Sequence, residues 1–542
     1  MTRPLHLFKR AALPLALAGV AVSVPLGQTG ATADSPHRDT VQLIRVSTPT
    51  KADKARLNRL GLDLAEAATA GTVDVVTHRP ADQRVLRSAG FTWTVVGADL
   101  EQAERDRVAA DQKYAAARAA SPLPSGRTSY RTLSDYNSDL DSLAASYPSQ
   151  ARVFDLNHTT LEGRTVKALE VANNVSGRDG RPTFVLLGLH HAREWPSGEL
   201  TIEFAYDVLQ RATDPRTKNI LDNARIVFVP VVNADGFNVS RSQVNEYKRK
   251  DCRVHDGQIP ATGECEDSAN SSLGTDPNRN YSGFWGGPGA STSTTSETYR
   301  GGGPFSEPET QNIKELVSAR QVTTLITNHT YSNLVLREPG YAAAGPTPDE
   351  TMYKALGDQL AAQNGYSSEF GYQLYDTTGT TEDWSYYATG GLAFTFEHGK
   401  SSFHPAFSNV IDFYYGTRKL AGKGNREAFL LAAESTINAA RHSVITGTAP
   451  AGAILRVKKQ FSTKTWNGTL VPDTLESTLV VPASGAYTWH VNPSTRPTVV
   501  AEGGTESWIL TCERPDGTVS ETKQVTVARG ASATANLTTC TL

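Results

Sequence analysis

PTFVLLGLHHAREW, residues 182–195, joins an apolar run directly to a polar cluster. The run at 184–189 is typical of a strand buried on both faces. In open α/β sheets, the residues that follow such a strand lie in the ligand crevice. His191 and Glu194 are three positions apart, so both side chains can face one metal ion from a tight turn or a first helical turn. The stretch therefore predicts an α/β fold with a metal site at a strand end.

Two other apolar runs end in residues that suit the same site. The run at 323–327 leads to His329, and the run at 392–396 ends at Glu397. The spacing of His191 and Glu194 alone favours a structural histidine, but a second histidine at another strand end changes that balance. Two histidines and one carboxylate leave a fourth position open on zinc, as in catalytic sites. Glu397 falls at the same expected edge and is a candidate general base rather than a solvated strand end.

Apolar runs alternate with helical patterns from residue 130 to about residue 440. The strand candidates are 184–189, 226–232, 323–327 and 392–396. Fully apolar strands interleaved with helices predict a mixed, mostly parallel central sheet that helices cover on both faces. The fold class is therefore α/β.

The chain also carries a shorter unit on each side of this region. Residues 41–118 alternate extended and helical runs, including a helix expected over 51–64, and predict a small α/β unit. A linker rich in proline and small residues follows at 121–127. Beyond 446, short runs rich in Thr, Val, Ser and Gly predict a β-sandwich. Its tryptophans could form a stacking surface for sugars or fill a core, and the core is favoured: Trp466, Trp489 and Trp508.

The N-terminus has the pattern of a secretory signal. Arg3, Lys9 and Arg10 precede an apolar run at 11–26, and a small-x-small site follows at 31–33. A retained membrane helix is the weaker alternative, because the run is short and contains two prolines. We expect a secreted protein without a membrane anchor.

The cysteines and the charge balance agree with an extracellular protein that does not bind nucleic acid. The four cysteines form two local pairs, Cys252 with Cys265 and Cys512 with Cys540, without the C-x-x-C spacing of a zinc site. Two disulfides are therefore expected. Lys and Arg total 53 against 56 Asp and Glu, a net charge of −3, so the chain has no general basic field.

Several further motifs, together with these residues, resemble the zinc metallocarboxypeptidase family. The similarity covers residues 128–445 and is greatest to bacterial carboxypeptidase T. The segments that carry it are Glu162-Gly163-Arg164, Asn233-Ala234-Asp235-Gly236, Asp276-Pro277-Asn278-Arg279-Asn280, Ser296-Glu297-Thr298-Tyr299-Arg300-Gly301, Ser306-Glu307-Pro308-Glu309-Thr310 and Asp383-Trp384.

The resemblance implies a role for each site residue. The zinc ligands are His191, Glu194 and His329, with Asp276 orienting a ligand histidine and Glu397 as the base. Arg249 steadies the oxyanion, Asn278 and Arg279 grip the terminal carboxylate of the substrate, Arg193 binds its backbone carbonyls, Tyr375 closes over it, and Glu382 lies at the base of the pocket for its last side chain. The resemblance also implies a structural calcium ion, to which no ligands are assigned.

The resulting prediction is a secreted zinc carboxypeptidase made as a proenzyme. It comprises a signal peptide at 1–33, a prosegment at 34–127, the peptidase domain at 128–445 and the β-sandwich at 446–542. We expect it to act on peptides with a free C-terminus, with mixed basic and hydrophobic specificity, after cleavage by an activating protease.

Two other functions compete with this one. An amidohydrolase of cell-wall peptides would keep the zinc chemistry but change carboxylate recognition, and the Asn278-Arg279 pair argues against it. A binding protein on an inactive peptidase scaffold would not need Glu397, so retention of this base and of the ligands argues against that function.

Overall fold

The computed structural model describes residues 40–69, 71–497 and 504–541. These residues belong to one compact unit that begins at Thr40. The predicted signal peptide at 1–33 lies outside the described residues. Within the described ranges, no helix is long and apolar enough to cross a membrane.

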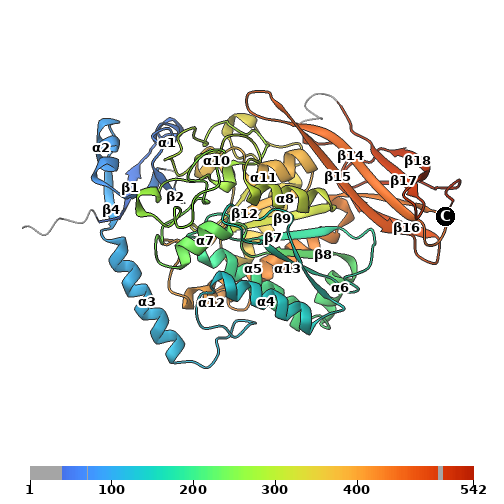
Figure 1. Ribbon diagram of the computed structural model, residues 1–542, viewed down its shortest axis with the longest axis horizontal. Helices are drawn as coiled ribbons and strands as arrows, with labels where there is room; N and C mark the ends of the chain where they lie inside the picture. The colour runs from blue at the N-terminus through green and yellow to red at the C-terminus, as the bar shows by residue number, and fades with distance from the viewer. Residues whose placement is uncertain (1–39, 70, 498–503, 542) are drawn as a thin grey trace, which may run out of the picture. The chain divides into compact units, whose positions relative to one another are not determined.

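An eight-stranded mixed sheet forms the centre of the peptidase region (Figure 1). Its central strands β12, β9, β7 and β8 run parallel to one another, and β6 joins β8 in antiparallel fashion. In sheet order the strands are β11 (Ser367–Phe370), β10 (Leu334–Arg337), β12 (Leu392–Glu397), β9 (Val322–His329), β7 (Thr183–Leu187), β8 (Arg225–Val229), β6 (Lys167–Val171) and β5 (Ala151–Asp155).

The central strands are buried along their whole length, as their apolar sequences require. Every residue of β7, β8, β9 and β12 is buried. Helices α5 (Trp195–Gln210) and α13 (Gly424–Ile437) pack on β7 and β9, whereas α9 (Glu350–Asn364) packs on β10 and β11 and α4 (Leu133–Ser146) packs on β5 and β6. The predicted fold class, a mixed and mostly parallel sheet covered by helices, is confirmed.

The register of the parallel strands brings three chain segments to one edge. Leu187, the last residue of β7, lies opposite Thr327 of β9, and Glu397, the last residue of β12, lies opposite His329. β9 and β12 therefore end at the same level of the sheet, and β7 ends two residues earlier at the same edge. The segments that leave these strand ends lie at the edge of the sheet where α/β proteins bind ligands.

The leading unit folds as a four-stranded antiparallel sheet in the order β2-β3-β1-β4, with three helices. The helix expected over 51–64 is shorter: α1 ends at Asn58, and a further strand, β2, begins at Asp63. Gly61 adopts a left-handed φ of 67°, which turns the chain between them. The elements are β1 (Gln42–Ser47), α1 (Lys51–Asn58), β2 (Asp63–Ala68), β3 (Thr72–Thr77), α2 (Pro80–Ser88), β4 (Trp93–Gly97) and α3 (Leu100–Ala116).

The C-terminal region forms two small sheets that share an apolar core. Trp489 and Trp508 are buried in that core, as predicted. Trp466 is 47% exposed and lies outside the core, so the prediction is wrong for this residue. The strands are β16 (Ala486–Val491), β13 (Ser443–Thr448) and β19 (Ser532–Thr534) in one sheet, and β15 (Leu470–Val480), β14 (Ile454–Lys464), β17 (Trp508–Glu513) and β18 (Val519–Val525) in the other.

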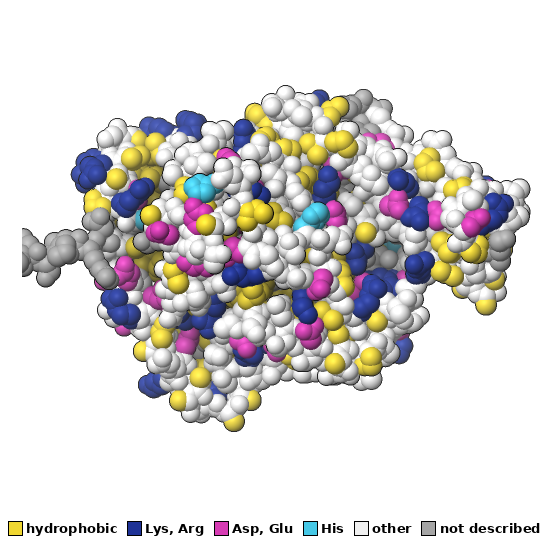
Figure 2. Space-filling model, in the orientation of Figure 1, with side chains coloured by type: hydrophobic (Ala, Val, Ile, Leu, Met, Phe, Trp, Pro, Cys, Tyr) yellow, Lys and Arg dark blue, Asp and Glu magenta, His cyan; other side chains and the backbone are white. Residues whose placement is uncertain are grey.

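Both expected disulfides are present, Cys252–Cys265 and Cys512–Cys540. Charged side chains of both signs are interspersed on the face shown in Figure 2, without a large patch of one sign. The charge distribution on this face agrees with the small net charge of the chain.

Gly188 is a position where the backbone between β7 and the site has no room for a side chain. A Cβ there would lie 2.7 Å from the carbonyl oxygens of Pro230 and Ser197. We expect Gly188→Ala to lower the free energy of unfolding by about 1–3 kcal/mol, because backbone atoms cannot move aside without cost. Thermal or denaturant unfolding measures the change. Gly302→Ala, at an exposed position with nothing within 4 Å, is the control and should unfold as the parent does. Equal stability of the two variants would contradict this packing.

Candidate active site

The first two metal ligands come from the turn between β7 and α5. After β7 the chain turns at Leu189, which has a φ of 52°, and reaches His191. Glu194 is the residue that precedes the first turn of α5. This tight turn directs both side chains to the same point, as the spacing of three predicted. The third ligand, His329, is the last residue of β9.

The three side chains converge closely. Oε1 of Glu194 lies 2.8 Å from Nδ1 of His191, and its Oε2 lies 2.9 Å from Nδ1 of His329. The two Nδ1 atoms are 3.0 Å apart. All three residues are buried. Two imidazole nitrogens and a carboxylate turned toward one point fit the donor set of a catalytic zinc ion.

The other ring nitrogen of each histidine also has a partner. Nε2 of His191 lies 3.1 Å from Oδ1 of Asp276, and Nε2 of His329 lies 3.0 Å from Oγ1 of Thr327. Such partners fix the orientation and tautomer of a ligand histidine. Both expected ligand histidines therefore have a hydrogen-bond partner on the nitrogen that faces away from the candidate metal site.

Asp276 connects the metal ligands to the residues expected to bind substrate. Its Oδ2 accepts hydrogen bonds from Nε and Nη2 of Arg249, at 3.2 and 3.0 Å, and its Oδ1 accepts from the backbone N–H of Asn278 at 2.9 Å. Burial alone would raise the pKa of Asp276, but the charges of Arg249, His191 and Arg279 hold it well below its usual range. Asp276 therefore stays ionised in a fully buried position.

Asn278 and Arg279 lie in the short 3-10 helix Pro277–Arg279 that Asp276 caps. Arg279 donates from Nε to the carbonyl of Gly289 at 3.0 Å and from Nη1 to the carbonyl of Asn278 at 2.8 Å. Oδ1 of Asn278 accepts from the backbone and the hydroxyl of Thr381, both at 2.9 Å. Backbone contacts thus fix the direction of both side chains.

Glu397 is buried and ends β12 directly opposite His329. Glu382 lies in the short helix α11 (Thr381–Trp384), and one of its oxygens, Oε2, is buried without a hydrogen-bond partner among the described residues. Tyr375 follows α10 (Gly371–Leu374) and packs in an apolar cluster with Leu374. Of these three residues, Glu397 lies beside an expected metal ligand in the sheet, and the helix of Glu382 reaches His190 through Thr381.

Arg193 is bound by the leading unit. Its Nη1 and Nη2 donate to the two oxygens of Asp63, at 2.6 and 2.7 Å, and both side chains are buried. His78 contacts the same carboxylate at 2.9 Å. Nothing in the local sequence distinguishes Asp63 from any other carboxylate in a strand, so the sequence analysis missed it.

The neighbouring His190 also escaped the sequence analysis. It is buried, and its ring nitrogens lie 3.0 Å from Oγ1 of Thr327 and 2.9 Å from the hydroxyl of Tyr281. Its ring stacks on that of His329. Burial and the nearby His329 and His191 lower the pKa of His190 well below its usual value, so it supports the site as a neutral residue.

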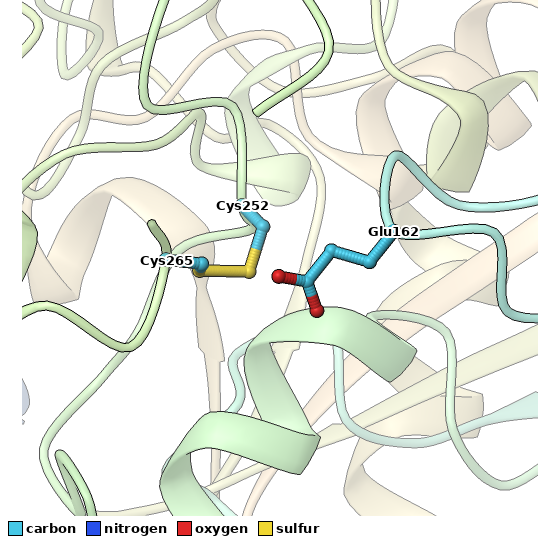
Figure 3. Close-up of side chains that lie close together, drawn as sticks. All are labelled: Glu162, Cys252 and Cys265. Carbon is cyan, nitrogen blue, oxygen red and sulfur yellow. A yellow bond between two sulfur atoms is a disulfide. The ribbon is translucent and has the colours of Figure 1, made fainter. Parts of the chain in front are cut away.

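Glu162 lies close to two cysteines, but this group is not a metal site. Figure 3 shows the carboxylate of Glu162 directed toward Cys252 and Cys265, whose sulfur atoms are bonded to each other. A disulfide provides no thiolate to bind a metal.

Comparison with known proteins agrees with this geometry. The model of the zinc carboxypeptidase family matches residues 136–419, and the chain belongs to this family. Carboxypeptidase A1 of Rattus norvegicus is 29% identical over 379 residues, covering 66% of this chain and 85% of that protein. A zinc carboxypeptidase of Saccharothrix mutabilis subsp. capreolus is 27% identical over 408 residues, covering 72% and 88%.

A solved structure shows the same fold. The crystal structure of carboxypeptidase A from Helicoverpa armigera matches 74% of this chain and 99% of its own, with a TM-score of 0.62 and 20% identity. The predicted family and enzyme class are confirmed: the chain is a metallocarboxypeptidase, which acts on peptides with a free C-terminus. The closer similarity to carboxypeptidase T stays a prediction.

We predict that Asp276→Asn weakens zinc binding by about 10–100-fold, because the amide removes the negative charge that orients His191. Competition with a chelator measures the affinity. Asp267→Asn, an exposed aspartate in the same long loop, should bind zinc as the parent does. An unchanged affinity in Asp276→Asn would show that this carboxylate does not support the ligand.

Proposed function

We propose that this chain is a secreted zinc carboxypeptidase, made as a proenzyme, that removes the C-terminal residue of peptides with mixed basic and hydrophobic preference. The observation that carries the proposal is the contact of one carboxylate, Asp276, with a metal ligand, His191, and with Arg249. The ligands and the arginine expected at the reacting carbonyl are thus held by the same group.

The assigned roles follow the chemistry of each side chain. Zinc, when bound, acts as a Lewis acid and lowers the pKa of a bound water to about 7. Glu397 accepts the proton of the attacking water and passes it to the leaving amine. Arg249 stabilises the negative charge that develops on the carbonyl oxygen.

Substrate binding would rest on a second group of residues. Arg279 offers a planar guanidinium to the terminal carboxylate, and Asn278 adds a hydrogen bond. Tyr375 closes over the bound residue, and Arg193 binds backbone carbonyls further along the peptide. A binding protein on an inactive scaffold would need none of the proton-transfer groups, and a peptide amidase would not need Arg279.

We predict that Glu397→Gln reduces kcat at least 100-fold, because proton transfer by a positioned carboxylate contributes about 10²–10⁴-fold. Zinc content by elemental analysis should stay at the level of the parent, since Glu397 is not among the ligands. His191→Ala, in contrast, should lose the metal. Parent-like turnover in a zinc-loaded Glu397→Gln protein would exclude Glu397 as the base.

Contacts of the leading unit support the assignment of residues 34–127 as an inhibitory prosegment. Asp63 occupies both Nη atoms of Arg193. Nζ of Lys54 donates to the carbonyls of Gln373 and Leu374, at 2.9 and 3.1 Å, and Asn58 donates to the carbonyl of Asp376 at 3.2 Å. The leading unit therefore binds one expected substrate-binding residue and the backbone on both sides of another, Tyr375.

We expect limited proteolysis near the 121–127 linker to raise the activity of the purified chain. Asp63→Asn should raise the activity of the uncleaved chain, because it removes the charge that binds Arg193. Asp74→Asn is the matched control, since Asp74 pairs with Arg45 inside the leading unit. If the uncleaved parent already matches the cleaved form on a peptide substrate, the prosegment assignment is wrong.

Buried carboxylates near α11 support a basic component in the specificity. Glu382 and Asp383 are adjacent and buried, and Glu338 lies against Asp383. The pKa of Asp383 is raised to about 7 by burial and by the charge of Glu382. A substrate Lys or Arg side chain would relieve this concentration of negative charge.

We predict that Glu382→Gln lowers the ratio of kcat/KM for substrates ending in Arg to that for substrates ending in Phe, by about tenfold or 1.4 kcal/mol. Because Asp383 gains its charge as the pH rises through about 7, the ratio of the parent should also increase from pH 6 to pH 8. Glu315→Gln, on the surface of α8 (Pro308–Ser318), is the control. A ratio that Glu382→Gln leaves unchanged would exclude Glu382 as the selector.

Secretion, the activating protease and a structural calcium ion belong to the same proposal. The two disulfides support an oxidising compartment outside the cytoplasm. The proposed protease would cleave near the proline-containing stretch at 121–127. Calcium remains an expectation from the family resemblance, without assigned ligands.

A further inference from the structure

The turn of the β14–β15 hairpin, residues 465–469, is a rigid projection of the C-terminal region. β14 and β15 pair along all their residues. The backbone of Thr465 donates to the carbonyl of Thr469 at 2.9 Å, and Gly468 adopts a φ of 87° that closes the turn. Asn467 accepts from the hydroxyl of Thr465 at 2.7 Å. The position of Trp466 in this turn is therefore well fixed.

The turn is hydrogen-bonded to the peptidase region through its backbone. The N–H of Trp466 donates to the carbonyl of Trp285 at 3.0 Å, and the N–H of Phe284 donates to the carbonyl of Lys464 at 3.4 Å. These bonds join the hairpin to the segment that begins a few residues after Arg279. The hairpin is thus attached to the chain that follows an expected substrate-binding residue.

The indole of Trp466 packs on two loops of the peptidase. A Cβ at Gly287 would lie 2.7 Å from Cε3 of Trp466 and 3.0 Å from Cγ2 of Thr378, so the ring closely covers this glycine. The ring also meets Tyr341 edge to face, with centroids 5.2 Å apart. Trp466 therefore contacts the 283–290 loop at Gly287, which Thr378 of the 375–380 loop also approaches, and it contacts Tyr341.

The 283–290 loop accepts hydrogen bonds both from Arg279, an expected substrate-binding residue, and from the loop that begins at Tyr375, another one. Arg279 donates from Nε to the carbonyl of Gly289, at 3.0 Å. Thr378 donates from its hydroxyl to the carbonyl of Pro288, at 2.9 Å. Movement of Gly287 away from the indole would shift the next two carbonyls, and with them both Arg279 and the loop that begins at Tyr375.

A second contact of the same hairpin reaches α11, the helix that contains Glu382. Nε1 of Trp384, in α11, donates to Oδ2 of Asp473 in β15 at 3.4 Å. Thr463 donates to the same oxygen, and Lys314 of α8 forms an ion pair with Asp473 at 3.2 Å. Figure 1 shows β14 and β15 beside α8 and α11. The hairpin therefore supports α11, two residues from Glu382.

We propose that Trp466 is a positioning residue of the peptidase, through which the C-terminal region aligns Arg279 and the Tyr375 loop with the terminal carboxylate of the substrate. The proposal rests on the function proposed above for those two residues. The indole is partly exposed. It packs on Gly287 and meets the ring of Tyr341 edge to face. These contacts are with other residues of the chain and suit a side chain that holds the 283–290 loop in place.

The test compares Trp466→Ala, Trp466→Phe and the control Leu470→Ala, an exposed apolar residue of the same hairpin. All are made in the full chain and given the same limited proteolysis. In Trp466→Ala we expect KM for a peptide with a free C-terminus to rise about tenfold, with kcat within about twofold and the zinc content unchanged. Trp466→Phe keeps an aromatic ring against Tyr341 and should recover most of the loss.

A binding measurement separates this proposal from the proposed function. Free arginine and phenylalanine carry the carboxylate that Arg279 grips, so their affinity for the zinc-loaded protein should fall in Trp466→Ala as KM rises. Parent-like KM and affinity in Trp466→Ala would overturn the proposal. So would a fall in kcat together with a loss of zinc and of thermal stability, which would mean that Trp466 only stabilises the fold. If the parent itself turns over no peptide, the proposed function fails, whatever the variants do.

Discussion

The buried carboxylate of Asp276 is the interaction on which the site depends. A charged group without contact to water is strongly unfavourable unless opposite charges and hydrogen bonds surround it. Asp276 meets this requirement with His191, two nitrogens of Arg249 and the N–H of Asn278. The contacts of Asp276 therefore fix an expected metal ligand, the expected oxyanion partner and the start of the helix that contains Asn278 and Arg279 relative to one another.

The central sheet positions the remaining residues of the candidate site. Parallel strands that end at one level place His329 and Glu397 side by side, while the turn after β7 adds His191 and Glu194. These parts could be predicted from the sequence, because a strand buried on both faces is recognisable by its apolar run. The polar residue that follows the run then lies at the carboxyl edge of the sheet.

Other parts of the site could not be predicted from local patterns. Asp276, Arg249 and Arg279 lie in irregular segments, and only the family motif pointed to them. The contact of Asp63 with Arg193 joins residues 130 positions apart, and neither sequence neighbourhood signals the other. Similarly, the sequence around the C-terminal tryptophans does not distinguish them. Trp489 is buried in a core, whereas Trp466 packs on the peptidase. Long-range packing decides between these outcomes.

The segment that contains Tyr375 is held from two directions. The leading unit binds its backbone through Lys54 and Asn58, and Thr378 binds it to the 283–290 loop on which Trp466 packs. The two sets of contacts differ in the proposed activation, because only the leading unit lies on the N-terminal side of the proposed cleavage region at 121–127. If the leading unit is removed as proposed, the carbonyls around Tyr375 lose these bonds, whereas Thr378 keeps its hydrogen bond to Pro288. The loop would then be free at its Tyr375 end and held at its Thr378 end by the same 283–290 loop that binds Arg279, which is the combination that the proposed closure of Tyr375 over a substrate requires.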